Sequence, residues 1–304
     1  MSRPSAVPCR PAYAAQTTLA RPATLAGRGV HSDRPSRVTL LPAAAGSGIV
    51  FGVDGVELHA DWRGVDATQM RMRLSSGQAS VSTVEHLLAA LAGLGVDNAF
   101  VLVEGEEIPA MDGSAQAFAE SIDEAGVVAL AAPRTSLRVV EPVRVSQGAG
   151  WAELAPAAHG LTLDVEIAFE RPIGRQRRRL ALTPETFRVE LARARSFGFL
   201  RDAERLWRAG LALGATLENT VVLDGEIVLN PQGLRYADEC LRHKMLDVVG
   251  DLALAGAPIV GAFRSFRGGH GLNLALLEAA MQAGALVREA ATATGEPPML
   301  RPSP

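Results

Sequence analysis

The chain repeats one succession of predicted elements: short β-rich runs, a strong apolar helix, one strand and a second helix. In the first half we expect strands at 38–41 and 48–51, a helix at 82–93, a strand at 98–103 and a helix at 115–126. In the second half we expect strands at 137–140, 151–154 and 161–169, helices at 184–192 and 197–209, a hairpin at 220–229, a helix at 238–254, a strand at 259–266 and a helix from residue 272. This order predicts an α+β fold of two similar α/β sandwich domains. Each would be a mainly antiparallel sheet with helices, and the helices would face each other across a shared site.

Composition marks the ends and the junction of these halves. Residues 1–16 are rich in Pro, Ser, Ala and Arg, so we expect a disordered N-terminal extension, and we expect a disordered tail at 287–304. The small-residue segment 129–135 is the predicted linker. Domain I would therefore span 17–130 and domain II 131–286.

The overall charge and the cysteines limit the class of protein. A formal charge of -3 with 21% charged residues does not indicate a nucleic-acid binder. Cys9 and Cys240 offer no disulfide framework and favour a reducing compartment. No apolar run approaches the roughly 18–20 residues that span a bilayer, so we expect a soluble cytoplasmic protein. We also expect a monomer. The basic run 175–179 lacks aromatic residues and is interpreted as a solvated hairpin rim, with at most peripheral membrane contact.

The helix predicted at 238–254 carries the strongest chemical signal. His243 and Asp247 stand one turn apart on one face, and Asp251 follows one turn further on. An imidazole and a carboxylate at this spacing can reach one divalent metal. Lys244 is the only lysine in the chain, which suggests a place where a compact ammonium is needed rather than a guanidinium.

The helix predicted to begin near Ser82 supplies the best third ligand. Ser82 is the expected N-cap, with Glu85 in the capping-box position. His86 lies in the first turn, and adjacent helix residues diverge by about 100°, so Glu85 would not share the coordination shell. Glu85 could instead act as a general base on a metal-bound water.

Each fragment also has a simpler explanation. A Glu-His pair at a helix start is more often a cap followed by a half-buried histidine, and a His-x-x-x-Asp pair is more often a solvated helix pair. Their occurrence together with Lys244, Asp251 and a histidine after two glycines, His270, favours a functional site.

Five segments, in order, resemble the signature segments of the UDP-3-O-acyl-N-acetylglucosamine deacetylases, the zinc amidases of lipid A biosynthesis. They are STVEHLLAAL at 82–91, IPAMDGS at 108–114, ARSFGF at 194–199, RHKMLD at 242–247 and GHGLN at 269–273. The similarity covers about residues 16–282. The resemblance implies zinc bound by His86, His243 and Asp247, with Glu85 as the base and iron as the competing metal.

The resemblance also implies roles for other catalytic residues. His270 would stabilise the oxyanion and protonate the leaving amine, and Asp251 would orient His270. Ser196 stands where the family usually has threonine; its hydroxyl would still hydrogen-bond the oxyanion.

Substrate contacts implied by the resemblance lie in both halves. Lys244 would hold the substrate near its diphosphate, and Arg267 stands where a lysine is common and would keep the attraction for phosphate. His31 and Phe169 match positions near the nucleotide part, and Phe197 would also contact substrate. An insert at about 197–222 would form an acyl-chain passage lined by Leu200, Leu206, Trp207, Ala212 and Ala215. Plain core packing explains the same apolar pattern.

We therefore predict a zinc-dependent hydrolase that releases acetate from UDP-3-O-acyl-N-acetylglucosamine, the committed step of lipid A biosynthesis. Two alternatives stay open. One is a related zinc amidohydrolase acting on another acylated amino sugar. The other is a non-enzymatic protein that binds metal or a nucleotide sugar, although such a binder has no need of Glu85 beside an open metal position.

Overall fold

The computed structural model describes residues 15–290, and the predictions for residues 1–14 and 291–304 lie outside this range. Two parts of the predicted disordered ends are strands. Residues 15 and 16 belong to β1 (Ala15–Leu19), and residues 287–290 belong to β20 (Leu286–Ala290). Strand β20 is ordered because it pairs antiparallel along the whole length of β11 (Thr135–Val139).

Domain I is built on a five-stranded sheet with the order β2-β3-β9-β4-β5. Its strands are β2 (Ala23–Arg28), β3 (Pro35–Pro42), β4 (Ile49–Val53), β5 (Val56–His59) and β9 (Ala99–Glu104). Neighbours are antiparallel except β4 and β9. The remaining elements are a 3-10 turn (Trp62–Gly64), the small sheet of β6 (Val65–Ala67), β7 (Arg73–Ser76) and β8 (Ala79–Ser82), and the helices α1 (Glu85–Leu94) and α2 (Gln116–Ala125).

Domain II is built on a seven-stranded sheet in which β13, β11 and β14 all pair with β19. The strands not yet placed are β12 (Val143–Gln147), β13 (Gly150–Ala155), β14 (Leu161–Ala168), β15 (Arg175–Ala181) and β19 (Ile259–Phe266). Its main helices are α5 (Glu239–Ala253) and α6 (His270–Gln282). A short helix α3 (Pro184–Thr186) continues as a π-helical turn (Phe187–Leu191).

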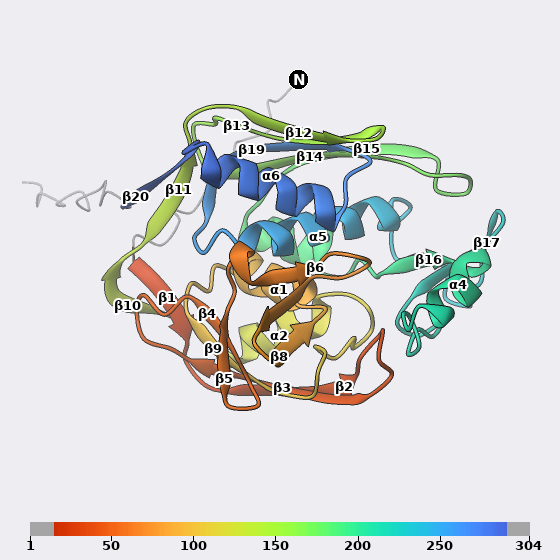
Figure 1. Ribbon diagram of the computed structural model, residues 1–304, viewed down its shortest axis with the longest axis horizontal. Coiled ribbons are helices and arrows are strands. Elements are labelled where there is room, and N and C mark those ends of the chain that lie inside the picture. Colours follow the sequence, from red (N-terminus) through yellow and green to blue (C-terminus); the bar gives the residue numbers. More distant parts are fainter. Residues whose placement is uncertain (1–14, 291–304) are drawn as a thin grey trace, which may run out of the picture.

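The two sheets lie on the outside of the molecule, and α1, α2, α5 and α6 lie between them (Figure 1). All residues of α1 except Ala92 are buried, as expected for a helix enclosed on all sides. Helices α1 and α5 approach very closely: a Cβ on Gly250 would lie 2.0 Å from the Glu85 carbonyl oxygen. The predicted α+β pair of sandwich domains with facing helices is confirmed.

A small insert projects from domain II (Figure 1). It consists of β16 (Phe197–Phe199), a 3-10 turn (Leu200–Asp202), α4 (Ala203–Arg208), β17 (Val221–Asp224) and β18 (Ile227–Val228). The prediction of a continuous helix at 197–209 is wrong for its first six residues. Residues 197–199 form a strand instead because they pair in parallel with 221–223.

Two other local predictions are also corrected. The predicted linker 129–135 is largely strand β10 (Val127–Pro133), which pairs antiparallel with β1. The domain boundary itself stays a prediction.

The predicted capping box is absent, since Val84 is the N-cap and makes no side-chain hydrogen bond. Thr83 has a positive φ of 59°, and the Glu85 carboxylate accepts from the Met72 backbone N–H at 3.0 Å. Glu85 is therefore turned away from the helix start that it was expected to cap.

Two further features bear on partners. Within residues 15–290, no helix is both long and apolar enough to cross a bilayer. The basic run lies in β15, where Arg177 pairs with Asp164 and Arg178 with Glu190 and Asp238. These acidic partners neutralise much of the run, as expected for a solvated rim.

Candidate metal centre

Three side chains from α1 and α5 point toward one another. His86 lies in the first turn of α1, and His243 and Asp247 lie one turn apart on α5. One potential ligand atom from each residue lies within 4.8 Å of the others. Asp247 Oδ1 is 3.7 Å from His86 Nε2 and 3.4 Å from His243 Nε2. The structure thus brings together the three residues that the sequence predicts as metal ligands.

The free donor atoms of this group fit a metal ion. Asp247 Oδ1 is buried and has no hydrogen-bond partner among residues 15–290. Such an oxygen is costly to leave unpaired, and a cation would satisfy it. His243 Nδ1 lies 3.1 Å from the Ala194 carbonyl oxygen. Because a carbonyl only accepts, Nδ1 carries the proton and Nε2 presents its lone pair. Two imidazole nitrogens and one carboxylate oxygen are a ligand set typical of Zn²⁺.

The electrostatics keep these ligands in the required protonation states. Burial lowers the pKa of His86 to about 3 and also lowers the pKa of His243, so both rings are neutral at pH 7. Burial alone would raise the pKa of Asp247. The positive groups around it, led by Lys244, together outweigh burial and hold the pKa below its usual range; Lys244 Nζ donates to Asp247 Oδ2 at 2.6 Å. A metal needs neutral imidazoles and an ionised carboxylate, and the three residues meet this requirement.

Glu85 lies beside the ligand group without belonging to it. Its Oε2 accepts the Met72 hydrogen bond, and its Oε1 lies 3.9 Å from His270 Nε2. Burial raises the pKa of Glu85 to about 7, and the nearby Asp247 charge adds to the effect. A bound cation would lower this pKa again. A buried carboxylate with a pKa at or below neutrality is suited to accept a proton.

His270 is the first residue of α6. Its Nε2 faces Glu85, and its Nδ1 is paired with Asp251. Its Nδ1 lies 2.9 Å from Asp251 Oδ2, and Asn273 Nδ2 donates to the same oxygen at 2.8 Å. Burial alone would lower the pKa of His270, but Asp251 outweighs it and raises the pKa to about 9. The ring is therefore a cation at pH 7. Asn273 was not predicted as a site residue, although it closes the GHGLN segment one turn after the histidine.

An aromatic wall adjoins the metal ligands. The ring of Phe197 meets the His243 ring edge-on at a centroid distance of 6.2 Å. Phe169 packs against Phe197 at 5.5 Å and Phe199 at 6.2 Å. The family resemblance implies roles for Phe169 and Phe197 but not for Phe199, which joins their cluster because strand alternation returns it to the same face as Phe197.

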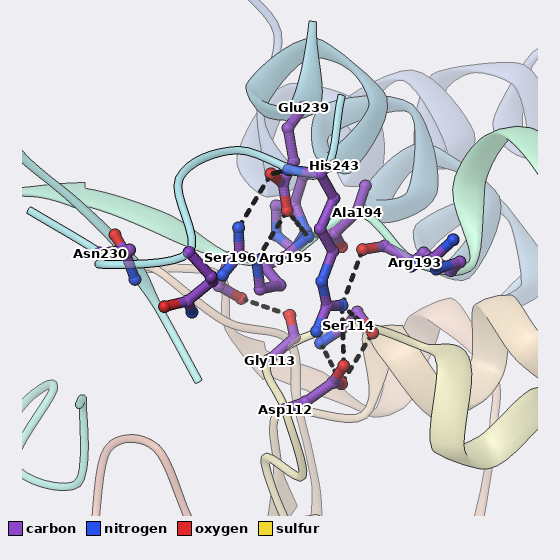
Figure 2. Close-up of polar contacts among 12 residues, drawn as sticks. Asp112, Gly113, Ser114, Arg193, Ala194, Arg195, Ser196, Asn230, Glu239 and His243 are labelled. Atoms are coloured by element: carbon purple, nitrogen blue, oxygen red, sulfur yellow. Dashed lines mark hydrogen bonds and ion pairs between the residues drawn. The ribbon is translucent and has the colours of Figure 1, made fainter. Parts of the chain in front are cut away.

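Ser196 and His31 both already have partners in the structure. Ser196 Oγ donates to the Gly113 carbonyl at 3.2 Å, so the 108–114 loop of domain I holds the hydroxyl (Figure 2). His31 is buried, its Nδ1 accepts from the Ala212 N–H at 3.1 Å, and its Nε2 faces the Met70 carbonyl at 3.3 Å. His31 thereby ties domain I to the insert. Its expected role near the nucleotide stays a prediction.

The remaining predicted substrate contacts lie in or near exposed regions. Arg267 is exposed just after β19 and has a positive φ of 50°. In the insert, Leu200 is 43% and Trp207 54% exposed, which plain core packing does not explain. The other predicted lining residues are half-buried: Leu206, Ala212 and Ala215.

The fold and this centre together define a metal-dependent hydrolase: two α+β sandwich domains whose central helices supply a buried His-His-Asp group, with a carboxylate and an imidazolium beside it. The family model of UDP-3-O-acyl N-acetylglycosamine deacetylase matches residues 16–282. The chain belongs to this family. Proteins named UDP-3-O-acyl-N-acetylglucosamine deacetylase from Brucella ovis, Brucella abortus and Brucella melitensis are each 47% identical to it over 264 residues. The match covers 85% of this chain and 92% of each relative.

Proposed function

We propose that the protein hydrolyses the N-acetyl amide of UDP-3-O-acyl-N-acetylglucosamine and releases acetate, a step of lipid A biosynthesis. The observation that carries the proposal is the pairing of a buried base with a buried acid beside the three donor atoms, with Glu85 Oε1 3.9 Å from His270 Nε2. An amide needs both, because water must lose a proton as it adds and the amine must gain one as it leaves. The proposed location is the cytoplasm, and the proposed state is a monomer.

His86, His243 and Asp247 would hold the metal. Bound there, Zn²⁺ would supply Lewis-acid polarisation of the amide carbonyl and of a water molecule. Fe²⁺ could use the same donors, since imidazole and carboxylate ligands accept both metals. Lys244 keeps Asp247 ionised and ready for either ion.

The chain's own groups move the protons. Glu85 accepts a proton from the attacking water, whose oxygen bonds to the carbonyl carbon. His270, cationic through its pairing with Asp251, faces the charge that develops on the carbonyl oxygen and stabilises it. Cleavage of the C–N bond then gives acetic acid and a sugar amine, which takes its proton from His270. The acid ionises to acetate, Glu85 releases the proton that it accepted, and His270 regains a proton from solvent. The Ser196 hydroxyl would add a hydrogen bond to the oxyanion after leaving the Gly113 carbonyl.

The direct test measures acetate release by the zinc-loaded protein. We expect turnover of UDP-3-O-acyl-N-acetylglucosamine and little or none of free N-acetylglucosamine, which lacks the nucleotide and the acyl chain. Similar rates on both would favour an amidohydrolase with another substrate. Tight substrate binding without acetate release would favour a binding protein.

The pH dependence of kcat/KM should have two limbs. The activity is expected to fall as the pH rises through about 9, because His270 loses its proton there. It should also fall on the acidic side as Glu85 becomes protonated, at about pH 7 without a metal. A bound cation lowers the Glu85 pKa and moves this limb to lower pH. Replacing Asp251 by asparagine removes the charge that raises the His270 pKa, so the basic limb should move to lower pH. A basic limb that does not move in Asp251→Asn would exclude His270 as its source.

Lys244→Arg tests the substrate role of the one lysine. We expect a higher KM with zinc retained. The guanidinium keeps the positive charge, but it is larger and planar and cannot put that charge where the compact ammonium lies. The half-buried ammonium also contacts Asp247, so zinc content is measured alongside KM. An unchanged KM would remove Lys244 from the substrate site.

A further inference from the structure

A fully buried ion pair lies one helical turn from the metal ligand His243. The side chains of Arg195, in the loop before β16, and Glu239, in the first turn of α5, are both 0% exposed. Arg195 Nε donates to Glu239 Oε1 at 2.8 Å, and Arg195 Nη2 donates to Glu239 Oε2 at 3.1 Å (Figure 2). Burying two charges is costly even when they are paired, and apolar residues often serve stability as well. Packing alone therefore does not account for this pair.

The peptide unit between Ala194 and Arg195 shows what the carboxylate does. Its N–H donates to Glu239 Oε1 at 3.1 Å, while its carbonyl oxygen accepts from His243 Nδ1 at 3.1 Å. The C=O and N–H of a trans peptide point in opposite directions, and Glu239 and His243 are four residues apart on one helix face. One peptide unit thus bridges one turn of α5, held at one end by Glu239 and at the other by His243.

The same carboxylate extends the arrangement toward domain I. The Arg235 backbone N–H donates to Glu239 Oε2 at 2.6 Å, and the Arg235 guanidinium contacts Asp112 Oδ2 at 2.8 Å. The next residue of the domain I loop, Gly113, accepts the Ser196 backbone N–H at 2.8 Å. Glu239 is therefore linked through Arg235 to the same domain I loop that accepts the Ser196 N–H.

We propose that Glu239, supported by Arg195, is a positioning residue for the metal centre: it orients the 194–195 peptide so that its carbonyl fixes the ring and tautomer of His243. Nδ1 is then held as the proton donor, and Nε2 remains free for the metal. The guanidinium makes the buried carboxylate tolerable and aligns it with the peptide N–H. This inference rests on the proposed metal site.

Two double variants separate the positioning role from the charge. Arg195→Met with Glu239→Gln removes both charges but keeps a side-chain oxygen that can accept the peptide N–H. Arg195→Met with Glu239→Leu removes both charges and that acceptor. Neither variant leaves an unpaired buried ion, and both are checked for folding by circular dichroism and thermal melting. Zinc affinity is then measured by competition with a chelator.

We expect the glutamine variant to bind zinc within a few-fold of the unmodified protein and the leucine variant to bind about 10–100-fold more weakly, the range typical for loss of a group that orients a ligand. Equal affinities in the two folded variants would overturn the positioning role. If the unmodified protein itself binds no zinc, the metal site fails, and this inference fails with it.

A second measurement needs no variant. Nitrogen-15 NMR of the imidazole rings in the unmodified, zinc-loaded protein reports which nitrogen of His243 carries the proton. The proposal requires a protonated Nδ1 that exchanges slowly with solvent and a metal-bound Nε2. The opposite tautomer would overturn it even if both double variants failed to fold.

Discussion

Glu85→Ala is expected to leave zinc bound and to lower kcat by about 10²–10⁴-fold, the range for loss of a general base. Zinc should remain because Glu85 is not one of the three donors that converge at the centre. Turnover should fall because the other two carboxylates at the centre are already engaged: Asp247 is one of the three donors and accepts from Lys244, and Asp251 pairs with His270. Acetate release and elemental analysis on the same sample measure both quantities.

Two controls make this result specific. Glu85→Gln keeps the side-chain volume and an oxygen that can accept the Met72 N–H, so it should fold well and still lose turnover. Glu104→Gln changes an exposed carboxylate at the end of β9 and should change neither quantity. Normal turnover in Glu85→Ala would sink the proposed mechanism.

His243→Ala is expected to abolish zinc binding together with activity. The substitution removes one of three ligands and leaves the Ala194 carbonyl without the Nδ1 donor. A cation held by only His86 and Asp247 would bind far more weakly than one held by three residues. Elemental analysis after dialysis measures the zinc-to-protein ratio, and thermal melting verifies that the fold persists.

The matched control for this variant is His159→Ala, because His159 is exposed in a turn before β14. It should retain full zinc and full activity. Undiminished zinc content in His243→Ala would show that the ligand assignment is wrong. Loss of zinc in His159→Ala would mean that the metal binds adventitiously at surface histidines.

The local part of the site could be predicted from the sequence because it depends on helix geometry alone. His243 and Asp247 are neighbours on any α-helix that contains them, and the helix was evident from its apolar pattern. The fold class followed similarly from the order of strands and helices. The resemblance of five segments added the roles of residues such as His270 that no local spacing could assign.

Other features could not be predicted because they depend on partners distant in the chain. Residues 197–199 are a strand only because 221–223 lie beside them. Glu85 does not cap its helix because the Met72 N–H, from a different segment, attracts its carboxylate. The backbone partners of the two His31 ring nitrogens, one of them in the insert, likewise depend on segments distant from it in the chain.

The sequence by itself determined which residue types could bind a metal, and it placed two of them on one helix face. Only the tertiary structure decided that His86 meets them, because the lack of a side chain on Gly250 lets α5 approach the Glu85 backbone. It also decided the tautomer of His243, since the Ala194 carbonyl and the buried Glu239 come from segments that meet only in the fold. Helix geometry is a local property, whereas burial and the choice of hydrogen-bond partner are set by packing.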